Sequence, residues 1–297
     1  MNFESRKARL SEMVSEPLIK FPMLLGRKMK NRHLQRIKSS VNCFVYSSLV
    51  SCFDKDFILC EDLLHKYEQD IERLPNITPN GLILPKHENY LAYHEVHKAV
   101  AEAISEFYGF MDKIHIPVNI RLVKGNSEGV NRPKASSKLH TDIWAGEFSN
   151  SIMIFMPLFG DIKNINVEFF EPPLEIFPDY IRYLSDYDDG AHFKEKSTFY
   201  DCELENDNIY FIDSFLLHRT VRKRTGGWRL SIDFRFLPWR SVETDVPIKT
   251  SRYENYIPVQ QWREIGTDKI LYSTNKMGEY NESHSDGYAD LYHLKML

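Results

Sequence analysis

The most constraining feature of the sequence is a series of short segments, rich in β-branched and aromatic residues, that runs from residue 116 to residue 237. Segments of this composition, several of them bounded by Gly, Asn, Asp or Pro, are typical of β-strands. No βα units separate them, so the pattern favours an antiparallel double-sheet jelly roll or a sandwich, with its core at 116–240. The eight predicted strands are 116–124, 136–144, 151–158, 165–172, 197–204, 207–213, 215–221 and 228–236.

The rest of the chain differs from this β-rich core. Residues 1–115 are predicted to be a helical support region, because apolar residues recur at steps of three and four in 56–75 and 93–110. The acidic, aromatic stretch 174–195 is expected to be an inserted helix or loop, and the polar stretch 241–297 a lid or tail. We expect one domain over the whole chain, of mainly β class, in which N-terminal helices precede a cupin-like double-stranded β-helix.

Composition and charge limit the classes of partner. The chain has 297 residues, of which 42% are hydrophobic and 27% charged, an ordinary globular balance with enough length for a sizeable core. The net charge of -4 gives no general attraction to nucleic acid or to an anionic membrane. Residues 1–40 are basic, with ten Lys or Arg against three Glu, and we interpret the run 26–38 at their centre as a solvated helical face.

The cysteines and the N-terminal stretch favour a reducing compartment. The sequence has four cysteines, and no two of them form a CxxC motif. Their spacing therefore indicates neither a zinc site nor a disulfide framework. They are Cys43, Cys52, Cys60 and Cys202. Reduced thiols are usual in the cytoplasm, and the first residues lack the apolar run of a secretory signal. No stretch has the length and composition of a membrane span. We therefore expect a cytoplasmic protein.

Two histidines in the second predicted helix resemble a fragment of a zinc-protease motif. His94 and His97 occur in the sequence HEVH, where they are three residues apart. The HExxH motif instead places its two zinc ligands four residues apart on one face of a helix. The spacing favours structural histidines over a metal site.

A candidate metal-binding pair lies inside the second predicted strand. His140 and Asp142 are two residues apart, so in a strand they point to the same face, about 6.6 Å apart along the chain. One imidazole nitrogen and one carboxylate oxygen suit a borderline divalent metal, but a third ligand must come from another strand. The pattern alone is weakly specific, because a second such pair, His284 and Asp286, occurs in the polar tail.

A distal histidine and an arginine are the partners that such a pair requires. His218 lies in the seventh predicted strand, and Arg229 follows it beyond the turn-forming run 222–227. A hairpin centred in that run would place His218 opposite Ser231 and Thr220 opposite Arg229. The shared polar face would line a reactive lumen, where buried charges must be paired or metal-bound, or would meet water outside a sandwich. With this register the face carries His218, Thr220, Arg229, Ser231, Asp233 and Arg235.

In their order and spacing, His140-Thr141-Asp142, His218 and Arg229-Leu230-Ser231 resemble the signature of the Fe(II)- and 2-oxoglutarate-dependent oxygenases. In that family HxD and a distal His bind iron as a facial triad. An Arg further along the chain, often within RxS, holds the co-substrate. The match covers 116–237. The sequence around the HxD pair is most similar to the phytanoyl-CoA hydroxylase-like branch and to small-molecule hydroxylases of sugar or antibiotic pathways.

The resemblance implies a role for each matching residue. His140, Asp142 and His218 would be the catalytic metal ligands. Arg229 would bind the far carboxylate of 2-oxoglutarate, because a guanidinium makes two parallel hydrogen bonds that a lysine cannot. Parity along the strands adds expected contacts: Ser231, Lys138 and Thr220 to the co-substrate, and Trp144, Asn119, Arg121 and Arg235 to the substrate.

The implied reaction is the hydroxylation of a C–H bond of a small polar metabolite, such as a sugar or a secondary-metabolite intermediate. Fe(II) would carry 2-oxoglutarate at two open positions and O₂ at the third, and succinate and CO₂ would be released. Asp142 favours hydroxylation over halogenation, since related halogenases have a small residue at that position. No nucleic-acid or membrane partner is expected, and the basic N-terminal segment would suit an acidic carrier if the substrate is carrier-tethered.

Two other functions are compatible with the same residues. A cupin-type metal-dependent isomerase or lyase could use the same barrel without 2-oxoglutarate, and Arg229 would then serve the substrate. A non-catalytic jelly-roll binding module would leave His140 and His218 as structural residues. Anaerobic titration with 2-oxoglutarate and Fe(II) tests the first alternative, and metal analysis of the purified protein tests the second.

Overall fold

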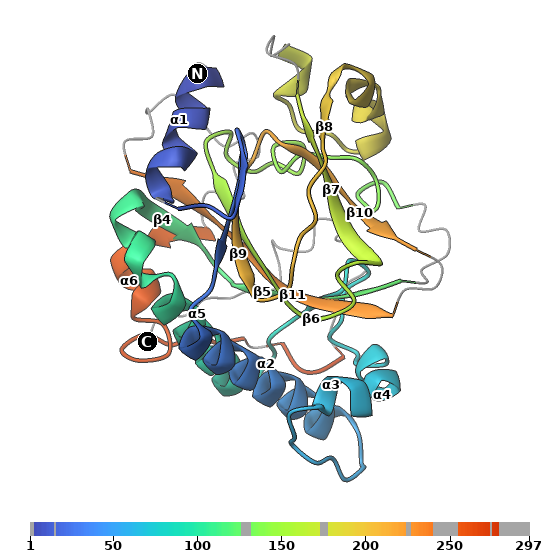
Figure 1. Ribbon diagram of the computed structural model, residues 1–297. Coiled ribbons are helices and arrows are strands. Elements are labelled where there is room, and N and C mark those ends of the chain that lie inside the picture. The colour runs from blue at the N-terminus through green and yellow to red at the C-terminus, as the bar shows by residue number, and fades with distance from the viewer. Residues whose placement is uncertain are drawn as a thin grey trace. The chain divides into compact units, whose positions relative to one another are not determined.

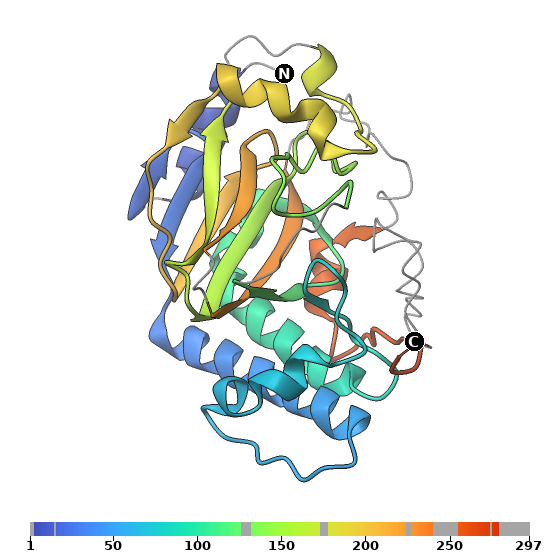
Figure 2. The same ribbon diagram turned by 90° about the vertical axis from the view of Figure 1, so that its right-hand side faces the viewer.

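The computed structural model describes residues 3–14, 16–125, 132–172, 178–223, 227–239, 255–273 and 275–278 (Figures 1 and 2). The chain divides into two compact units. The first unit comprises Met1–Lys28, Gly109–Val118 and Leu122–Ile257, and the second comprises Met29–Tyr108, Asn119–Arg121 and Pro258–Leu297. Most of the predicted lid or tail, including the pair His284 and Asp286, lies outside the described residues.

The first unit is built from antiparallel strands in two sheets. The larger sheet follows the order β1, β2, β9, β6, β11, β4, β12, and the smaller follows the order β10, β7, β8. The strands on this path of the larger sheet are β1 (Ile19–Phe21), β2 (Leu24–Lys28), β4 (Met111–His115), β6 (Ile152–Gly160), β9 (Asn208–Asp213), β11 (Trp228–Pro238) and β12 (Tyr256–Pro258). Those of the smaller sheet are β7 (Ile165–Glu171), β8 (Thr198–Tyr200) and β10 (Leu217–Arg222).

The two sheets of the first unit share one hydrophobic core. The strand β9 is buried along its whole length, as expected for a central strand that is covered on both faces. Phe169 from β7 and Leu217 from β10 belong to the same buried cluster as Phe155 from β6 and Ile212 from β9. Burial of each such side chain stabilises the fold by about 1.5–3 kcal/mol. This cluster holds the smaller sheet against the larger one.

Short helical elements flank these sheets. The helix α1 (Phe3–Met13) is anchored by Arg6, which is 1% exposed and lies 2.5 Å from the carboxylate of Asp213 at the end of β9. The stretch predicted as an insertion contains two 3-10 helices, η2 (Pro178–Tyr180) and η3 (Tyr187–Lys196), drawn in yellow in Figures 1 and 2. In the described part of the chain, no helix has both the length and the apolar character needed to span a membrane.

The second unit is mostly helical. The helices α2 (Asn31–Cys52) and α5 (Tyr90–Ala103) pack against each other through their apolar faces. Arg36 on α2 forms an ion pair with Glu102 on α5, and both side chains are more than 40% exposed, so this part of the basic run is a solvated helical face. The other elements are α3 (Leu63–Lys66), α4 (Glu68–Glu72), β3 (Leu82–Ile83), η1 (Ser105–Phe110), which continues into the first unit, β5 (Asn119–Lys124), shared with the first unit, and α6 (Val259–Arg263).

Most of the strand predictions are confirmed. β5, β6, β7, β9, β10 and β11 occupy six of the eight predicted segments, and β8 occupies three residues of a seventh. The predicted strand 136–144 is wrong, because only His140 forms a β-bridge in it and residues 142–146 form a turn. Residues 1–115 are not purely helical either, since β1, β2 and β4 join the larger sheet and β3 pairs with β5. The long helix expected in 56–75 is replaced by the short α3 and α4.

The predicted hairpin between the last two segments is also wrong. β10 pairs with β7 in the smaller sheet, so His218 lies opposite Phe169. β11 pairs with β6 in the larger sheet, so Ser231 lies opposite Pro157. The chain therefore crosses from one sheet to the other between β10 and β11, and Thr220 does not pair with Arg229.

Candidate functional site

The two candidate histidines of the first unit face each other. The backbone of His140 forms an antiparallel bridge with His218, with N–O distances of 2.9 and 2.8 Å in the two directions. Residues directly opposite in such a bridge place their side chains on the same side. The imidazole centroids accordingly lie 4.3 Å apart, with the ring planes inclined at 54°.

The hydrogen bonds of the two rings define which nitrogen atoms can bind a metal. Nδ1 of His140 donates to the carbonyl of Lys138 at 2.8 Å, and Nδ1 of His218 donates to the carbonyl of Leu216 at 3.0 Å. In a neutral imidazole whose Nδ1 carries the proton, Nε2 keeps a lone pair, and this is the usual state of a metal-binding histidine. Both rings therefore present Nε2 as the atom able to coordinate.

Both imidazoles are neutral at pH 7. Burial, assisted by the proximity of His218, lowers the pKa of His140 to about 3. Burial likewise lowers the pKa of His218 below its ordinary value. Neither ring then needs to lose a proton before it can coordinate a metal.

Asp142 lies beside the histidines, in the turn that follows His140. Its two carboxylate oxygens accept hydrogen bonds from Nη2 of Arg235 at 2.6 Å and from Nε of Arg235 at 2.9 Å. Burial alone would raise the pKa of Asp142, but the charge and hydrogen bonds of Arg235 lower it to about 2. Arg235 thus keeps a buried carboxylate ionised, and its predicted contact with the substrate stays a prediction.

The donor set fits a divalent ion such as iron in its chemistry. Two neutral imidazoles and one carboxylate are the ligands of the facial triad, and each carboxylate oxygen has a second lone pair beyond the one that accepts from Arg235. In the described residues, however, no group of three or more His, Cys, Asp or Glu side chains is assembled as a metal cage. The structure brings the three predicted ligands into one buried neighbourhood, with Asp142 directed toward Arg235.

Arg229 and Ser231 lie on β11, six and four residues before Arg235. Arg229 is 2% exposed, donates to the carbonyl of Ile165 at 2.8 Å and lies 5.3 Å from the ring centroid of Phe155. Ser231 is fully buried, and its Oγ has no hydrogen-bond partner in the described part of the chain. Thr220 is 8% exposed on β10, two residues beyond His218. A buried guanidinium and a buried free hydroxyl are suited to an anionic ligand.

Four other predicted contacts have different surroundings. Lys138 forms ion pairs with Asp186 and Asp188 of the insertion. Trp144 is a core residue whose indole N–H donates to the carbonyl of Tyr180 at 2.8 Å, because the turn after Asp142 breaks the predicted strand parity. Asn119 and Arg121 belong to the second unit, where Arg121 donates to the carbonyl of Asn80.

Sequence reasoning missed Tyr187, which contacts a candidate ligand, and it missed the partner of Arg235. The ring of Tyr187 stacks on His140 with a centroid distance of 4.5 Å and an interplanar angle of 5°. Arg235 was considered, but its bond to Asp142 joins residues 93 positions apart and leaves no local pattern. Tyr187 lies in the stretch that was expected only to be an inserted helix or loop, and no motif marks it.

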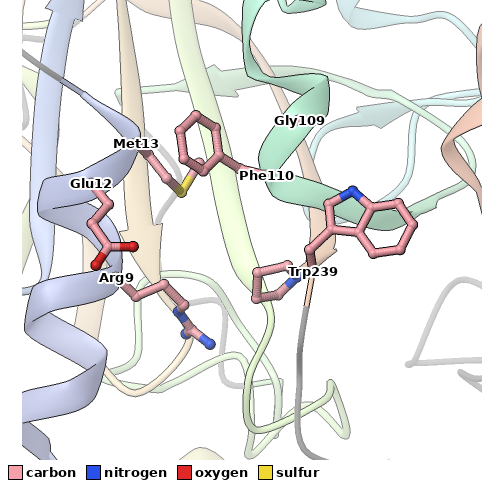
Figure 3. A pocket seen from close by; sticks show the side chains of 7 residues that line it. Arg9, Glu12, Met13, Gly109, Phe110 and Trp239 are labelled. Carbon is pink, nitrogen blue, oxygen red and sulfur yellow. The ribbon is translucent and has the colours of Figure 1, made fainter.

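A cavity of about 440 Å³ lies elsewhere in the first unit (Figure 3). Figure 3 shows side chains of α1 on one side and Trp239 on the other. It shares no lining residue with the histidine pair, so it is not the candidate site. It is lined by Arg9, Glu12, Met13, Gly109, Phe110, Pro238 and Trp239.

Comparisons with known proteins give similar structures but no related sequence. No protein-family model matches the chain, and no curated protein matches it. The non-heme alpha ketoglutarate dependent epimerase SnoN from nogalamycin biosynthesis is 13% identical with a TM-score of 0.38, covering 79% of this chain and 82% of its own. The carbocyclase SnoK from the same biosynthesis is 10% identical with a TM-score of 0.44, covering 80% and 85%.

A third similar structure is EctD from S. alaskensis, crystallised with 2-oxoglutarate and 5-hydroxyectoine. It is 14% identical with a TM-score of 0.43, and the match covers 82% of each chain. All three TM-scores are below 0.5. Such likenesses do not by themselves assign a fold family, a cofactor or a reaction to this chain.

Proposed function

We propose that the protein is a non-haem Fe(II)- and 2-oxoglutarate-dependent oxygenase that hydroxylates a C–H bond of a small polar metabolite. The observation that carries the proposal is the opposed pair His140 and His218. In both rings the Nδ1–H group donates a hydrogen bond to a backbone carbonyl. Each Nε2 lone pair is thereby left for a metal, and the ionised carboxylate of Asp142 lies beside them. Two histidines that serve only to pack the core need neither free Nε2 lone pairs nor an ionised carboxylate beside them.

His140, Asp142 and His218 would hold the iron. Bound Fe(II) and 2-oxoglutarate together supply the oxidation of a C–H bond, coupled to conversion of the co-substrate to succinate and CO₂. Arg235 contributes by keeping Asp142 ionised and by fixing the plane of its carboxylate. An aspartate at this position supports hydroxylation rather than halogenation.

Arg229 would bind the distal carboxylate of 2-oxoglutarate. Its guanidinium is buried, and in a site of low dielectric a bidentate ion pair with a carboxylate is stronger than in water. The free hydroxyl of Ser231 would donate a further hydrogen bond from the same strand. Thr220 would lie beside the co-substrate, because it shares the side of β10 that carries His218.

The architecture is consistent with a double-stranded β-helix of the phytanoyl-CoA hydroxylase-like type. One histidine-bearing strand, β10, is in the smaller sheet, and the arginine-bearing strand, β11, is in the larger sheet. The two sheets share a core, so residues on their inner sides approach one another. Arg235 on β11, in the larger sheet, forms an ion pair with Asp142. Asp142 lies two residues after His140, which is bridged to β10 in the smaller sheet, so the two sheets approach each other here.

The proposal is tested by anaerobic calorimetric titration of the metal-free protein with Fe(II), followed by 2-oxoglutarate. We expect one iron site and iron-dependent binding of 2-oxoglutarate, both absent in His140→Ala and retained in His65→Ala, which removes an exposed histidine of α3. Release of succinate from 2-oxoglutarate under air gives a second readout. Metal binding without 2-oxoglutarate binding would instead support a cupin-type isomerase or lyase, and absence of metal binding would support a binding module.

A further inference from the structure

The insertion packs directly on the turn that carries the first two candidate ligands. The backbone N–H of Tyr187 donates to the carbonyl of Pro133 at 3.0 Å, and that of Leu184 donates to the carbonyl of Trp144 at 3.0 Å. The indole of Trp144 donates in return to the carbonyl of Tyr180. The insertion therefore brackets His140 and Asp142 with hydrogen bonds on both sides in the sequence.

Tyr187 is the part of the insertion that reaches a candidate ligand. Its side chain is buried, at 5% exposure, and its ring lies parallel to the imidazole of His140 at 4.5 Å. The hydrogen bond from Nδ1 to the carbonyl of Lys138 fixes one point of that imidazole but not the tilt of its plane. A parallel aromatic neighbour fixes the plane, and with it the direction of the Nε2 lone pair.

Two ion pairs hold Tyr187 in place. Nζ of Lys138 lies 2.8 Å from Asp186 and 2.5 Å from Asp188, the residues immediately before and after Tyr187. These hydrogen bonds raise the pKa of Lys138 although its partial burial would lower it. Lys138 thus supplies the carbonyl that orients His140 and the ammonium group that ties down the neighbours of Tyr187. Both contacts start from one residue, so the insertion and the ligand are mechanically linked.

We propose that Tyr187 is a positioning residue of the candidate metal site, and that the Lys138–Asp186/Asp188 ion pairs are the latch that keeps its ring on His140. This inference rests on the proposed function and adds the insertion to the metal-binding apparatus. Metal affinity and docking of the insertion are then coupled, and by thermodynamic linkage each strengthens the other. Added salt weakens metal binding, because it screens the exposed carboxylate of Asp188.

The first test compares Tyr187→Leu with Tyr187→Phe in the full chain. Titration of the metal-free protein with Co(II), followed by its visible absorption, reports both affinity and coordination geometry. We expect Tyr187→Leu to weaken binding by about 10–100-fold and to change the absorption spectrum, as the loss of a residue that orients a ligand does. Tyr187→Phe, which keeps the ring, is expected to restore the wild-type spectrum and an affinity within about 3-fold.

The second test leaves the buried ring intact and opens the latch. The double variant Asp186→Asn with Asp188→Asn is expected to weaken Co(II) binding by about 3–10-fold at low salt and to make it insensitive to salt. The control is Asp189→Asn, which removes one carboxylate charge from an exposed neighbour outside the ion pairs and is expected to bind Co(II) as the wild type does. Far-ultraviolet circular dichroism of each variant identifies a chain that has failed to fold.

The possible outcomes separate this inference from the proposed function. Wild-type protein that binds no Co(II) or Fe(II) would refute the proposed function. Wild-type binding with unchanged affinity and spectrum in Tyr187→Leu and in the double variant would refute the role of Tyr187 and leave the proposed function standing. If Tyr187→Leu fails to fold, the double variant and its control decide the matter alone.

Discussion

Two pairs of histidines in the described part of the chain differ in what their ring nitrogens do. His140 and His218 in the first unit use Nδ1 to hold backbone carbonyls and leave Nε2 for a ligand. His94 and His97 on α5 in the second unit use Nε2 instead, bonding to the backbone carbonyls of Leu271 at 2.9 Å and Trp262 at 2.8 Å. Among the described residues, the first pair has the buried carboxylate of Asp142 beside it.

Burial and titration do not distinguish the two pairs. Burial lowers the pKa of His97 to about 4, much as it lowers that of His140 to about 3. A shifted histidine pKa therefore marks a desolvated ring and not a functional site. The direction of the remaining lone pair and the presence of an acidic neighbour decide the function.

The largest expected effect separates the pairs by metal binding. We expect His218→Ala to reduce Fe(II) or Co(II) affinity by on the order of 100-fold or more, because it removes a coordinating atom. His94→Ala should retain the affinity of the wild type, since Nε2 of His94 is already bonded to Leu271. Anaerobic titration of both variants measures the difference, and equal losses in the two would contradict the assignment of separate roles.

The histidines of the second unit are expected to affect stability and not metal binding. His97 is fully buried, and its ring lies 4.2 Å from that of Trp262. His97→Ala leaves a cavity and an unsatisfied carbonyl, so we expect a loss of about 2–4 kcal/mol in the free energy of unfolding. Urea denaturation followed by circular dichroism measures it. Unchanged stability, or weakened metal binding in folded His97→Ala, would remove the contrast between the pairs.

The pH dependence of stability sharpens the same contrast. His97 has a pKa of about 4 when folded and about 6.5 when unfolded, so between these values the unfolded chain binds more protons and stability falls as the pH is lowered. The contribution of this residue between pH 7 and pH 5 is about 2 kcal/mol. We expect His97→Leu to flatten the stability profile by that amount, measured by urea denaturation at each pH. A slope identical to that of the wild type would show that His97 is not the titrating group.

The sequence predicted the parts of this comparison that are encoded locally. The strands β6 and β9 follow from their largely apolar composition, and β11 follows from its alternation of polar and apolar residues. The i,i+3 spacing of His94 and His97 predicted structural histidines, in agreement with their bonds to backbone carbonyls. The spacing of His140 and Asp142 alone was weakly specific, and their role as metal ligands stays a prediction.

What failed depended on contacts distant in the sequence. Whether 136–144 forms a strand depends on a partner, and the structure gives it one β-bridge, from His140 to His218, and one further backbone hydrogen bond, from Thr220 N–H to the carbonyl of Ser136. The hairpin failed because β10 and β11 find partners in different sheets, which local turn signals do not encode. The pairing of Asp142 with Arg235 and the stacking of Tyr187 likewise join residues far apart along the chain.

The smallest effect tests whether the insertion supports only the first pair. A Cβ added at Gly190 would lie 2.3 Å from the indole of Trp144, which is fully buried and cannot move aside freely. We expect Gly190→Ala to cost about 1–2 kcal/mol in the free energy of unfolding through overpacking. Gly109→Ala is the control, because nothing lies within 4 Å of its added Cβ.

Gly190→Ala should also weaken metal binding, because it displaces the insertion. Gly190 is three residues from Tyr187, so a displaced η3 shifts the ring that lies on His140. We therefore expect Gly190→Ala to weaken Co(II) binding by about 2–5-fold, less than removal of the tyrosine ring does. The carbonyl bonds of His94 and His97 lie in the second unit and should be unaffected, as amide hydrogen exchange over α5 would report. Lost protection of α5 with unchanged Co(II) affinity would reverse the expected order and show that the insertion supports the other histidine pair.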